Sequence, residues 1–483
     1  MGTHRVSALP TPTSAQPKIL RSLRCCYMNN KPLDFPFLRS KVVTTVISAK
    51  TSVALDSKLT AIQNRLFERA HVEPMELKFL GIALGKQGIV GDAIYANPSM
   101  MPFPIQRCEY LKSLSNRQIA ILTACFFANF YKTVANSESQ ALVSNMAAAE
   151  KSFEPYSDEY MILHQETSEE MDHIWTFRSV YNMVARETRS EEPFEAPGFF
   201  LGMVGSIPQD DYNSVDTQFR LSEECSHILE LLHKPEGLQI LLDEMKKKGR
   251  GFRYRTQHFL IGDAMRLLPA EDVQSLGLGG LWLLTRFAAN VELKQGESYL
   301  FVDPEKFNYE PLAYNINQGH LHDEARHYTT SFDIGLTLYQ AARPEAQAFI
   351  RELMRMTMED YIKGQFLVFP EMLEAYSKGC LTIPFYFCKQ TLEMAMSHQE
   401  FSDKLNNIDD LFSSWAQMEW PKKLPPFDAG LLTQKRWRYI SQQYERIRQA
   451  IGIEYDVASL GNLLHRYKDI LKQENLTEAF ILA

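Results

Sequence analysis

One pattern of glutamates and histidines occurs twice in this chain and limits what it can fold into. Its members are Glu138, Glu170 and His173 in the first copy, and Glu292, Glu324 and His327 in the second. In both copies a lone Glu precedes a Glu-x-x-His pair, and the interval from Glu138 to Glu170 equals that from Glu292 to Glu324. Residues i and i+3 share one face of a helix, so each pair can reach the same metal ion. A carboxylate-bridged dimetal centre in a four-helix bundle needs this inventory.

Three other Glu-x-x-His sequences show that the motif alone has little specificity. They are Glu68/His71, Glu224/His227 and Glu230/His233. Even the spacing recurs, because Glu192 precedes Glu224 by the same interval. Glu192 precedes a proline, however, which disfavours a helix there. The first pair ends at a helix stop and the other two lie among charged residues, so we interpret all three as surface pairs.

The two favoured pairs lie in apolar helical stripes instead. Leu163, Phe177 and Val180 share the face of Glu170, while Ile316 and Ile334 share the face of Glu324. A carboxylate buried there would be costly unless a cation compensated it. Four glutamates would balance the charge of two divalent metals.

His320 adds a third imidazole to the face of Glu324, four residues upstream of it. A simple bundle site uses two histidines. Taken alone, His320 could therefore be a ligand or a hydrogen-bonding neighbour of one.

The periodicity predicts a mainly α protein with a central four-helix bundle and additional helices at both ends. Helices are expected at 56–70, 116–151, 158–186, 270–297, 311–342, 434–451 and 458–473, with a further helix capped by Ser222. The most strand-like stretch is 296–307. We divide the chain into an N-terminal tail (1–45), a helical extension (46–109), the bundle (110–345) with an inserted loop and basic segment (188–258), and a C-terminal helical region (346–483).

Composition excludes several classes of protein. The net charge of −8 and pI near 5.9 disfavour a nucleic-acid binder. No apolar run is long enough for a membrane span. Seven cysteines without a C-x-x-C predict neither a disulfide framework nor a zinc knuckle, so a cytoplasmic location is expected. The chain contains no Asp or Glu before Asp34, which suits a disordered tail better than a transit peptide.

The run from His320 to His327 resembles the p-aminobenzoate N-oxygenase family of ferritin-like non-haem di-iron enzymes. That family has two Glu-x-x-His motifs, a lone Glu upstream of each, and an extra histidine before the second. The resemblance covers about 110–345 and implies as iron ligands Glu138, Glu170, His173, Glu292, His320, Glu324 and His327. Manganese or a mixed-metal pair remains open, because ligand identity alone does not fix the metal. The segments outside this core leave the substrate undetermined.

By resemblance, the chain is expected to use O2 to oxidise a primary amine, free or carrier-bound, to a hydroxylamine and onward to nitroso or nitro products. Such an N-oxygenase would belong to specialised metabolism. A di-iron enzyme of another class, catalysing C-hydroxylation, desaturation or C–C cleavage, is the alternative. A non-catalytic helical metal-binding protein is a third, weaker one.

Electrons are expected from an external reductase or ferredoxin, since the only glycine cluster, at 277–280, breaks the dinucleotide-binding pattern. The basic run 246–255 could dock an acidic partner, although a solvated surface explains it more simply. A homodimer is compatible with the sequence, whereas nucleic-acid and membrane partners are not expected.

Residues around the expected centre have less certain roles. Asp172 and Asp323 could orient ligating imidazoles, and Arg326 could pair with a neighbouring carboxylate. A substrate pocket would lie near six aromatic residues, for each of which core packing is the simpler interpretation. These are Phe126, Phe127, Phe130, Tyr131, Phe177 and Phe287.

Overall fold

The computed structural model describes residues 77–101, 105, 113–189, 215–366, 383–405 and 434–453. The side chains of 215–220, 250–251, 292, 360–366, 383–389, 434–438 and 441 lie outside this description. All described residues belong to one compact unit, Lys50–Ala483. The expected tail, the helices expected at 56–70 and 458–473, and the pair Glu68/His71 fall outside the described residues.

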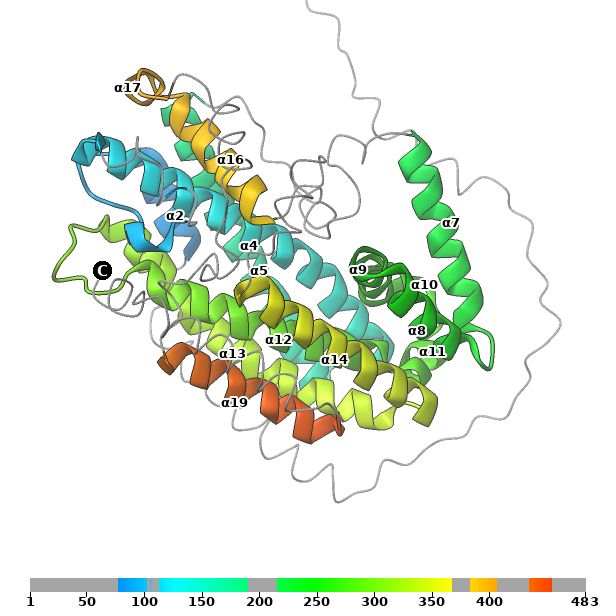
Figure 1. Cartoon of the computed structure of the whole chain (residues 1–483). Helices are drawn as coiled ribbons and strands as arrows, with labels where there is room; N and C mark the ends of the chain where they lie inside the picture. The colour runs from blue at the N-terminus through cyan, green and yellow to red at the C-terminus, as the bar shows by residue number, and fades with distance from the viewer. Residues whose placement is uncertain are drawn as a thin grey trace, which may run out of the picture. The chain divides into compact units, whose positions relative to one another are not determined.

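Four long helices form the centre of this unit (Figure 1). They are α4 (Asn116–Ser152), α5 (Asp158–Thr188), α12 (Leu278–Leu300) and α13 (Pro311–Ala341). The sequence-adjacent pairs α4–α5 and α12–α13 pack along their lengths, and α4 also contacts α12 while α5 contacts α13. The predicted mainly α helical bundle is confirmed.

Local sequence explains where three of these helices begin. Ser115 caps α4 in a capping box with Gln118, in which each side chain satisfies a backbone N–H of the first turn. Ser157 caps α5 by accepting from the backbone N–H of Tyr160. The Glu310 side chain caps α13, which opens with Pro311. The predicted starts of all three helices are confirmed.

The single helix expected at 270–297 is wrong. The chain instead forms α11 (Ala270–Leu276) and α12, separated by Gly277. Gly277 has a φ of 64°, a left-handed conformation that ends α11 as a glycine C-cap and then serves as the N-cap of α12. The bundle helix therefore starts later than the periodicity indicated.

Two other local predictions are also wrong. Ser222 does not cap a helix, because α7 (Val215–Leu232) already begins seven residues earlier and Ser222 lies exposed within it. The strand-like stretch 296–307 begins as the last turn of α12 and continues as irregular chain. Within the described residues, the strand-type pairing found is an isolated bridge between Ile94 and Tyr309.

Further helices cover the bundle. They are α2 (Leu77–Gln87), η2 (Pro98–Met100), α8 (Gly237–Lys248), α9 (Arg250–Phe259), the π-helical segment η5 (Leu260–Ala264), α10 (Met265–Leu267), α14 (Pro344–Phe366), α16 (Ile383–Met396), α17 (Gln399–Ser402) and α19 (Gln434–Ile451). Helix α2 packs on α5 and α13, α16 packs on α4, and α14 and α19 pack on α12. Among the described helices, none has the length and apolarity needed to cross a bilayer.

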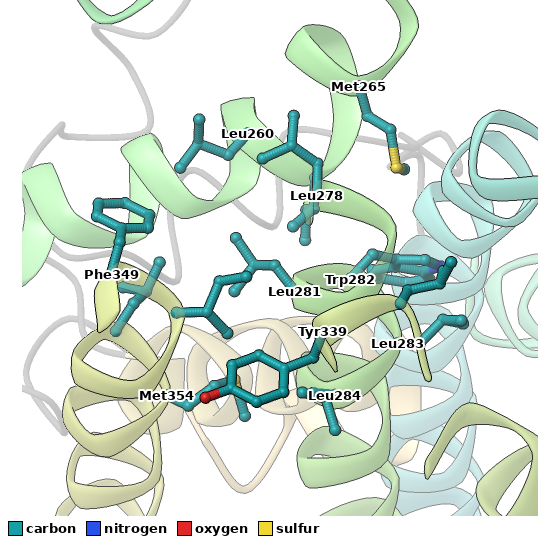
Figure 2. Packing of buried hydrophobic residues seen from close by; sticks show 14 of the residues in the cluster. Leu260, Met265, Leu278, Leu281, Trp282, Leu283, Leu284, Tyr339, Phe349 and Met354 are labelled. Carbon is teal, nitrogen blue, oxygen red and sulfur yellow. The ribbon is translucent and has the colours of Figure 1, made fainter. Parts of the chain in front are cut away.

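One end of the core forms where α12, α13 and α14 meet (Figure 2). Leu281 and Leu284 of α12 pack with Tyr339 of α13 and Met354 of α14, and all four side chains are buried. These contacts hold α12 and α13 together, and α13 carries three of the seven predicted site residues.

Candidate metal centre

Three helices bring six of the seven predicted site residues together. Helix α4 supplies Glu138, α5 supplies Glu170 and His173, and α13 supplies His320, Glu324 and His327. All six residues are buried, with exposed fractions of 5% or less. The structure therefore brings the first motif copy together with the Glu-x-x-His pair of the second. The seventh, Glu292, lies on α12, but its side chain is outside the described part.

The six residues form two groups that meet at Glu324. Each residue of the group Glu138, His173, His320 and Glu324 offers a ligand atom within 4.8 Å of the others, and the same holds for the group Glu170, Glu324 and His327. We call these the four-residue group and the three-residue group. A carboxylate shared between two groups is what a bridging ligand of a dimetal centre requires.

In the four-residue group, two imidazoles face the carboxylates. His320 Nε2 lies 2.8 Å from Glu138 Oε1 and 3.7 Å from Glu324 Oε1. His173 Nδ1 lies 3.5 Å from Glu138 Oε1 and 3.7 Å from Glu324 Oε1. Two nitrogens and two carboxylates therefore surround one point.

The three-residue group also approaches Glu324 through Oε1. His327 Nδ1 is 2.9 Å from Glu324 Oε1 and 3.2 Å from Glu170 Oε1. Glu170 also approaches the first group, because its Oε2 lies 3.5 Å from His173 Nδ1. Glu170 thus lies between the groups, as Glu324 does.

Unpaired buried atoms indicate that a cation fits here. Glu138 Oε2, Glu170 Oε2 and His173 Nδ1 are buried and have no hydrogen-bond partner. Leaving such atoms unpaired costs free energy, whereas a metal ion would accept their lone pairs. Mixed imidazole and carboxylate donors suit iron, manganese or zinc.

Each site histidine directs its second nitrogen to another carboxylate. His173 Nε2 lies 3.3 Å from Asp323 Oδ2, His327 Nε2 lies 2.8 Å from Glu169 Oε2, and His320 Nδ1 lies 2.6 Å from Glu297 Oε1. This arrangement fixes the orientation of metal-binding histidines in proteins.

These carboxylates were only partly predicted. Asp323 contacts the outer nitrogen of His173, as predicted. For the Asp172 carboxylate, no such contact with a site histidine is found within the described part of the chain. Sequence reasoning missed Glu169 and Glu297. Glu169 directly precedes Glu170, so adjacency was the one available signal.

The predicted pairing of Arg326 is confirmed. Its Nη1 donates to Glu169 at 2.9 Å and its Nη2 donates to Asp323 at 2.6 Å. Burial alone would raise the pKa of Glu169, but hydrogen bonding to His327 and the nearby Arg326 charge lower it to about 2. Arg326 therefore helps His327 to lower the pKa of Glu169, and it links the outer contacts of His173 and His327.

A second buried arginine was not predicted at all. Arg286 of α12 forms ion pairs with Glu166 and Glu170, and all three side chains are buried. Burial would raise the pKa of Glu170, but the Arg286 and His327 charges lower it well below its usual range. Glu170 consequently remains a carboxylate, the form that binds metals.

Helix α12 also reaches Glu324. Asn290 Nδ2 donates to Glu324 Oε2 at 2.8 Å, which leaves Oε1 directed at the histidines. Arg286, Asn290 and Glu297 are four and seven residues apart, a spacing that places them on one face of α12. That spacing is the sequence feature from which a common role of these three residues could have been predicted.

The two other Glu-x-x-His pairs within the described residues lie at partly or fully exposed positions, as interpreted from the sequence. Glu224 accepts two hydrogen bonds from Arg255 at 2.8 Å, and His227 pairs with Glu244 at 2.8 Å. Glu230 and His233 are exposed.

Acidic neighbours already occupy much of the basic run. Lys246 pairs with Glu352 at 3.1 Å and Lys248 pairs with Glu244 at 2.7 Å. Its role in docking a partner stays a prediction.

The aromatic residues near the centre pack tightly against one another. Tyr131 stacks on Phe177 at 4.2 Å between ring centroids, and Phe287 stacks on Tyr328 at 4.2 Å. Their role in a substrate pocket stays a prediction.

Comparison with known proteins gives one match. A model of the family described as acyl halogenase, CylC-like, matches residues 110–399, which is more than half of the 483-residue chain. The match spans all four bundle helices and every residue of both groups. No curated protein and no solved structure matches the chain significantly.

Proposed function

Because the chain belongs to the CylC-like acyl halogenase family, we propose that it is a dimetal oxidative enzyme that halogenates an acyl chain. The observation that carries this proposal is the pair of buried ligand groups sharing Glu324, inside the region that the family matches. The N-oxygenase family that the sequence resembles has the same ligand pattern, so the resemblance supports the metal centre. It does not distinguish the two reactions, and the proposed reaction therefore rests on the family match.

In this proposal, the four-residue group holds one iron ion and the three-residue group holds the other. Glu324, which belongs to both groups, and Glu170, which approaches both, would be the carboxylates that the two ions share. Glu292 remains a predicted ligand from α12 for the three-residue group, which has fewer donors. Two iron ions held there would supply electrons to O2 and thereby the oxidising power for cleavage of a C–H bond.

The protein's own residues fix the geometry of the centre. Arg286 compensates Glu170 and Glu166, Asn290 restrains Glu324, and Arg326 holds the carboxylates behind His173 and His327. A rigid, buried set of ligands excludes water and prevents the side reactions of a strong oxidant.

The overall reaction requires a reductant. One C–H bond, one halide ion, O2, two electrons and three protons give one C–halogen bond and two water molecules. The described residues show no nucleotide-binding motif, so we propose an external reductase or ferredoxin as the electron donor. An acyl group bound to a carrier is the proposed substrate form.

Amine N-oxygenation is the second candidate. It is favoured by the third histidine, because His320 lies within the ligand group and completes the seven-residue pattern of the N-oxygenases that the sequence resembles. Both candidates use the same metals, O2 and electron supply. They differ in the bond that is oxidised, in the need for a halide ion and in whether oxygen enters the product.

The test is a product assay on protein loaded anaerobically with Fe(II). Acyl thioesters or amines are added with chloride or bromide, a chemical reductant and 18O2, and products are analysed by mass spectrometry. We expect a halogenated acyl product that changes mass when bromide replaces chloride and carries no 18O. An 18O-labelled hydroxylamine or nitro product would favour N-oxygenation, and an 18O-labelled alcohol would indicate C-hydroxylation.

A matched pair of variants tests whether the centre is responsible. Glu324→Ala removes the shared carboxylate, whereas Glu230→Ala removes an exposed glutamate from another Glu-x-x-His pair. We expect activity to vanish in the first variant and to persist in the second. Undiminished activity of folded Glu324→Ala would contradict the proposed centre.

A further inference from the structure

The three site histidines differ in what holds their outer nitrogen. Asp323 and Glu169, behind His173 and His327, have side chains 27% and 18% exposed and share Arg326. Glu297, behind His320, is completely buried, and none of the described arginines forms an ion pair with it. A buried carboxylate without a cation requires another source of stabilisation.

One neutral side chain, Tyr131, contributes to it directly, and a second, Asn317, holds Tyr131, while Glu297 Oε2 has no hydrogen-bond partner among the described residues. The Tyr131 hydroxyl donates to Glu297 Oε1 at 2.9 Å. Asn317 Nδ2 donates to the Tyr131 hydroxyl oxygen at 2.9 Å and approaches the Glu297 backbone carbonyl at 3.3 Å. Tyr131, Asn317 and Glu297 are all fully buried, and they come from α4, α13 and α12.

The chemistry of these groups sets the direction of the hydrogen bonds. An amide nitrogen can only donate, so the Tyr131 oxygen accepts from Asn317 and its own proton points to Glu297. An ionised Glu297 only accepts, so in that form it accepts one hydrogen bond from Tyr131 and another from His320 Nδ1. A neutral His320 with its proton on Nδ1 has an unprotonated Nε2, which faces the four-residue group.

The opposite tautomer would damage the metal site. His320 Nε2 lies 2.8 Å from Glu138 Oε1, so a proton on Nε2 would be donated to that carboxylate. One hydrogen bond would then occupy two ligand atoms of the four-residue group. Glu297 and Glu138 compete for the proton of His320, and only the bond to Glu297 leaves a metal-binding nitrogen.

Aromatic packing holds the imidazole in place. The Phe177 ring lies 4.9 Å from the His320 ring, edge to face, and Phe177 stacks on Tyr131 at 4.2 Å. The hydrogen-bonded residues therefore cannot shift independently of the imidazole that they orient.

We propose that Glu297, anchored by Tyr131 and Asn317, is a positioning residue that holds His320 in its metal-binding tautomer. This proposal rests on the proposed dimetal function. In it, Glu297, Tyr131 and Asn317 form a hydrogen-bond network that supports the four-residue group. Glu297 acts on the metal only through His320.

The test measures metal binding, independently of activity. Metal-free protein is titrated with Co(II) against a competing chelator while the optical absorption of the bound metal is recorded. In Glu297→Gln the amide can donate to His320 and no longer enforces the tautomer. We expect the affinity of one of the two metals to fall about 10- to 100-fold, and its absorption bands to change.

Two tyrosine variants separate this role from a general effect on the core. Tyr131→Phe removes the hydroxyl that anchors Glu297. Tyr95→Phe is the matched control, because Tyr95 is also fully buried, also contacts Phe127, and donates its hydroxyl proton in a hydrogen bond to the Gly88 carbonyl. We expect Tyr131→Phe to weaken the same metal position and alter its spectrum, while Tyr95→Phe keeps the spectrum of the unsubstituted protein.

The outcomes distinguish this proposal from the proposed function. Two metals in the unsubstituted protein, with unchanged affinity and spectrum in Glu297→Gln and Tyr131→Phe, would overturn the positioning role alone. An unsubstituted protein that binds no metal would overturn the dimetal function and with it this proposal.

Discussion

Arg286 shows how much of the site depends on a single residue. It lies in the sequence Trp282-Leu-Leu-Thr-Arg-Phe287, where the apolar neighbours predict core packing. The structure places its guanidinium between Glu166 and Glu170, where burial opposes its charge and the two carboxylates raise its pKa. The sequence does not show this role, because both partners come from another helix.

Replacing Arg286 should destabilise the protein. In Arg286→Met, Glu166 and Glu170 would remain buried without their cation, at a cost of about 3–5 kcal/mol in the free energy of unfolding. Arg255→Met is the control, because Arg255 also pairs with a glutamate but at a partly exposed site, where about 0–1 kcal/mol is expected. Urea denaturation of the metal-free proteins measures both, and equal losses would contradict the account.

The residues of the candidate centre were predictable to different degrees. The ligand candidates on α4, α5 and α13 were recognised because their spacing repeats and because they interrupt apolar stripes. Glu169, Glu297 and Asn290 were missed, since each acts on a residue of a different helix, and neither adjacency to Glu170 nor spacing along α12 identifies that partner. Glu292 remains a prediction.

At the scale of the helices, close backbone approach determines how α12 and α13 pack. A Cβ atom on Gly280 would lie 2.7 Å from the backbone nitrogen of Tyr339, and one on Gly335 would lie 2.9 Å from the Cβ of Leu283. Both glycines therefore allow a contact that any larger residue would prevent. Because α13 carries three site residues, this packing also positions the metal centre.

Gly335→Ala should separate these helices. We expect a loss of about 1–3 kcal/mol in the free energy of unfolding, because the added methyl group meets the backbone of α12. The control is Gly296→Ala in α12, where the nearest atoms, those of the Phe130 ring, lie at 3.6 Å. Alanine should be neutral there or stabilise by up to about 1 kcal/mol. Thermal unfolding measures both, and a neutral Gly335→Ala would show that the approach is not tight.

Helix ends followed local rules where a cap was present. The starts of α4, α5 and α13 were predicted because Ser115, Ser157 and Pro311 mark them in the sequence. The boundary between α11 and α12 was missed because Gly277 lies within a continuous apolar period, which hides a left-handed turn. The close packing of α12 on α13 could not be predicted, because the sequence does not show which helix a glycine such as Gly280 or Gly335 will contact.

At the scale of the whole molecule, three helices distant in sequence meet at one buried polar cluster. Glu138 and His327 are far apart along the chain, yet both belong to groups that share Glu324. Without a cation, this cluster places several carboxylates and imidazoles in the core with unpaired atoms. Metal binding at the centre would therefore stabilise the folded protein by mass action.

The most direct test of the central claim is anomalous X-ray diffraction from crystals of iron-loaded protein, recorded at the iron edge. The account predicts two peaks per chain, one among Glu138, His173, His320 and Glu324, and one among Glu170, Glu324 and His327. A chain without a peak at these residues, or with iron bound only elsewhere, would contradict it.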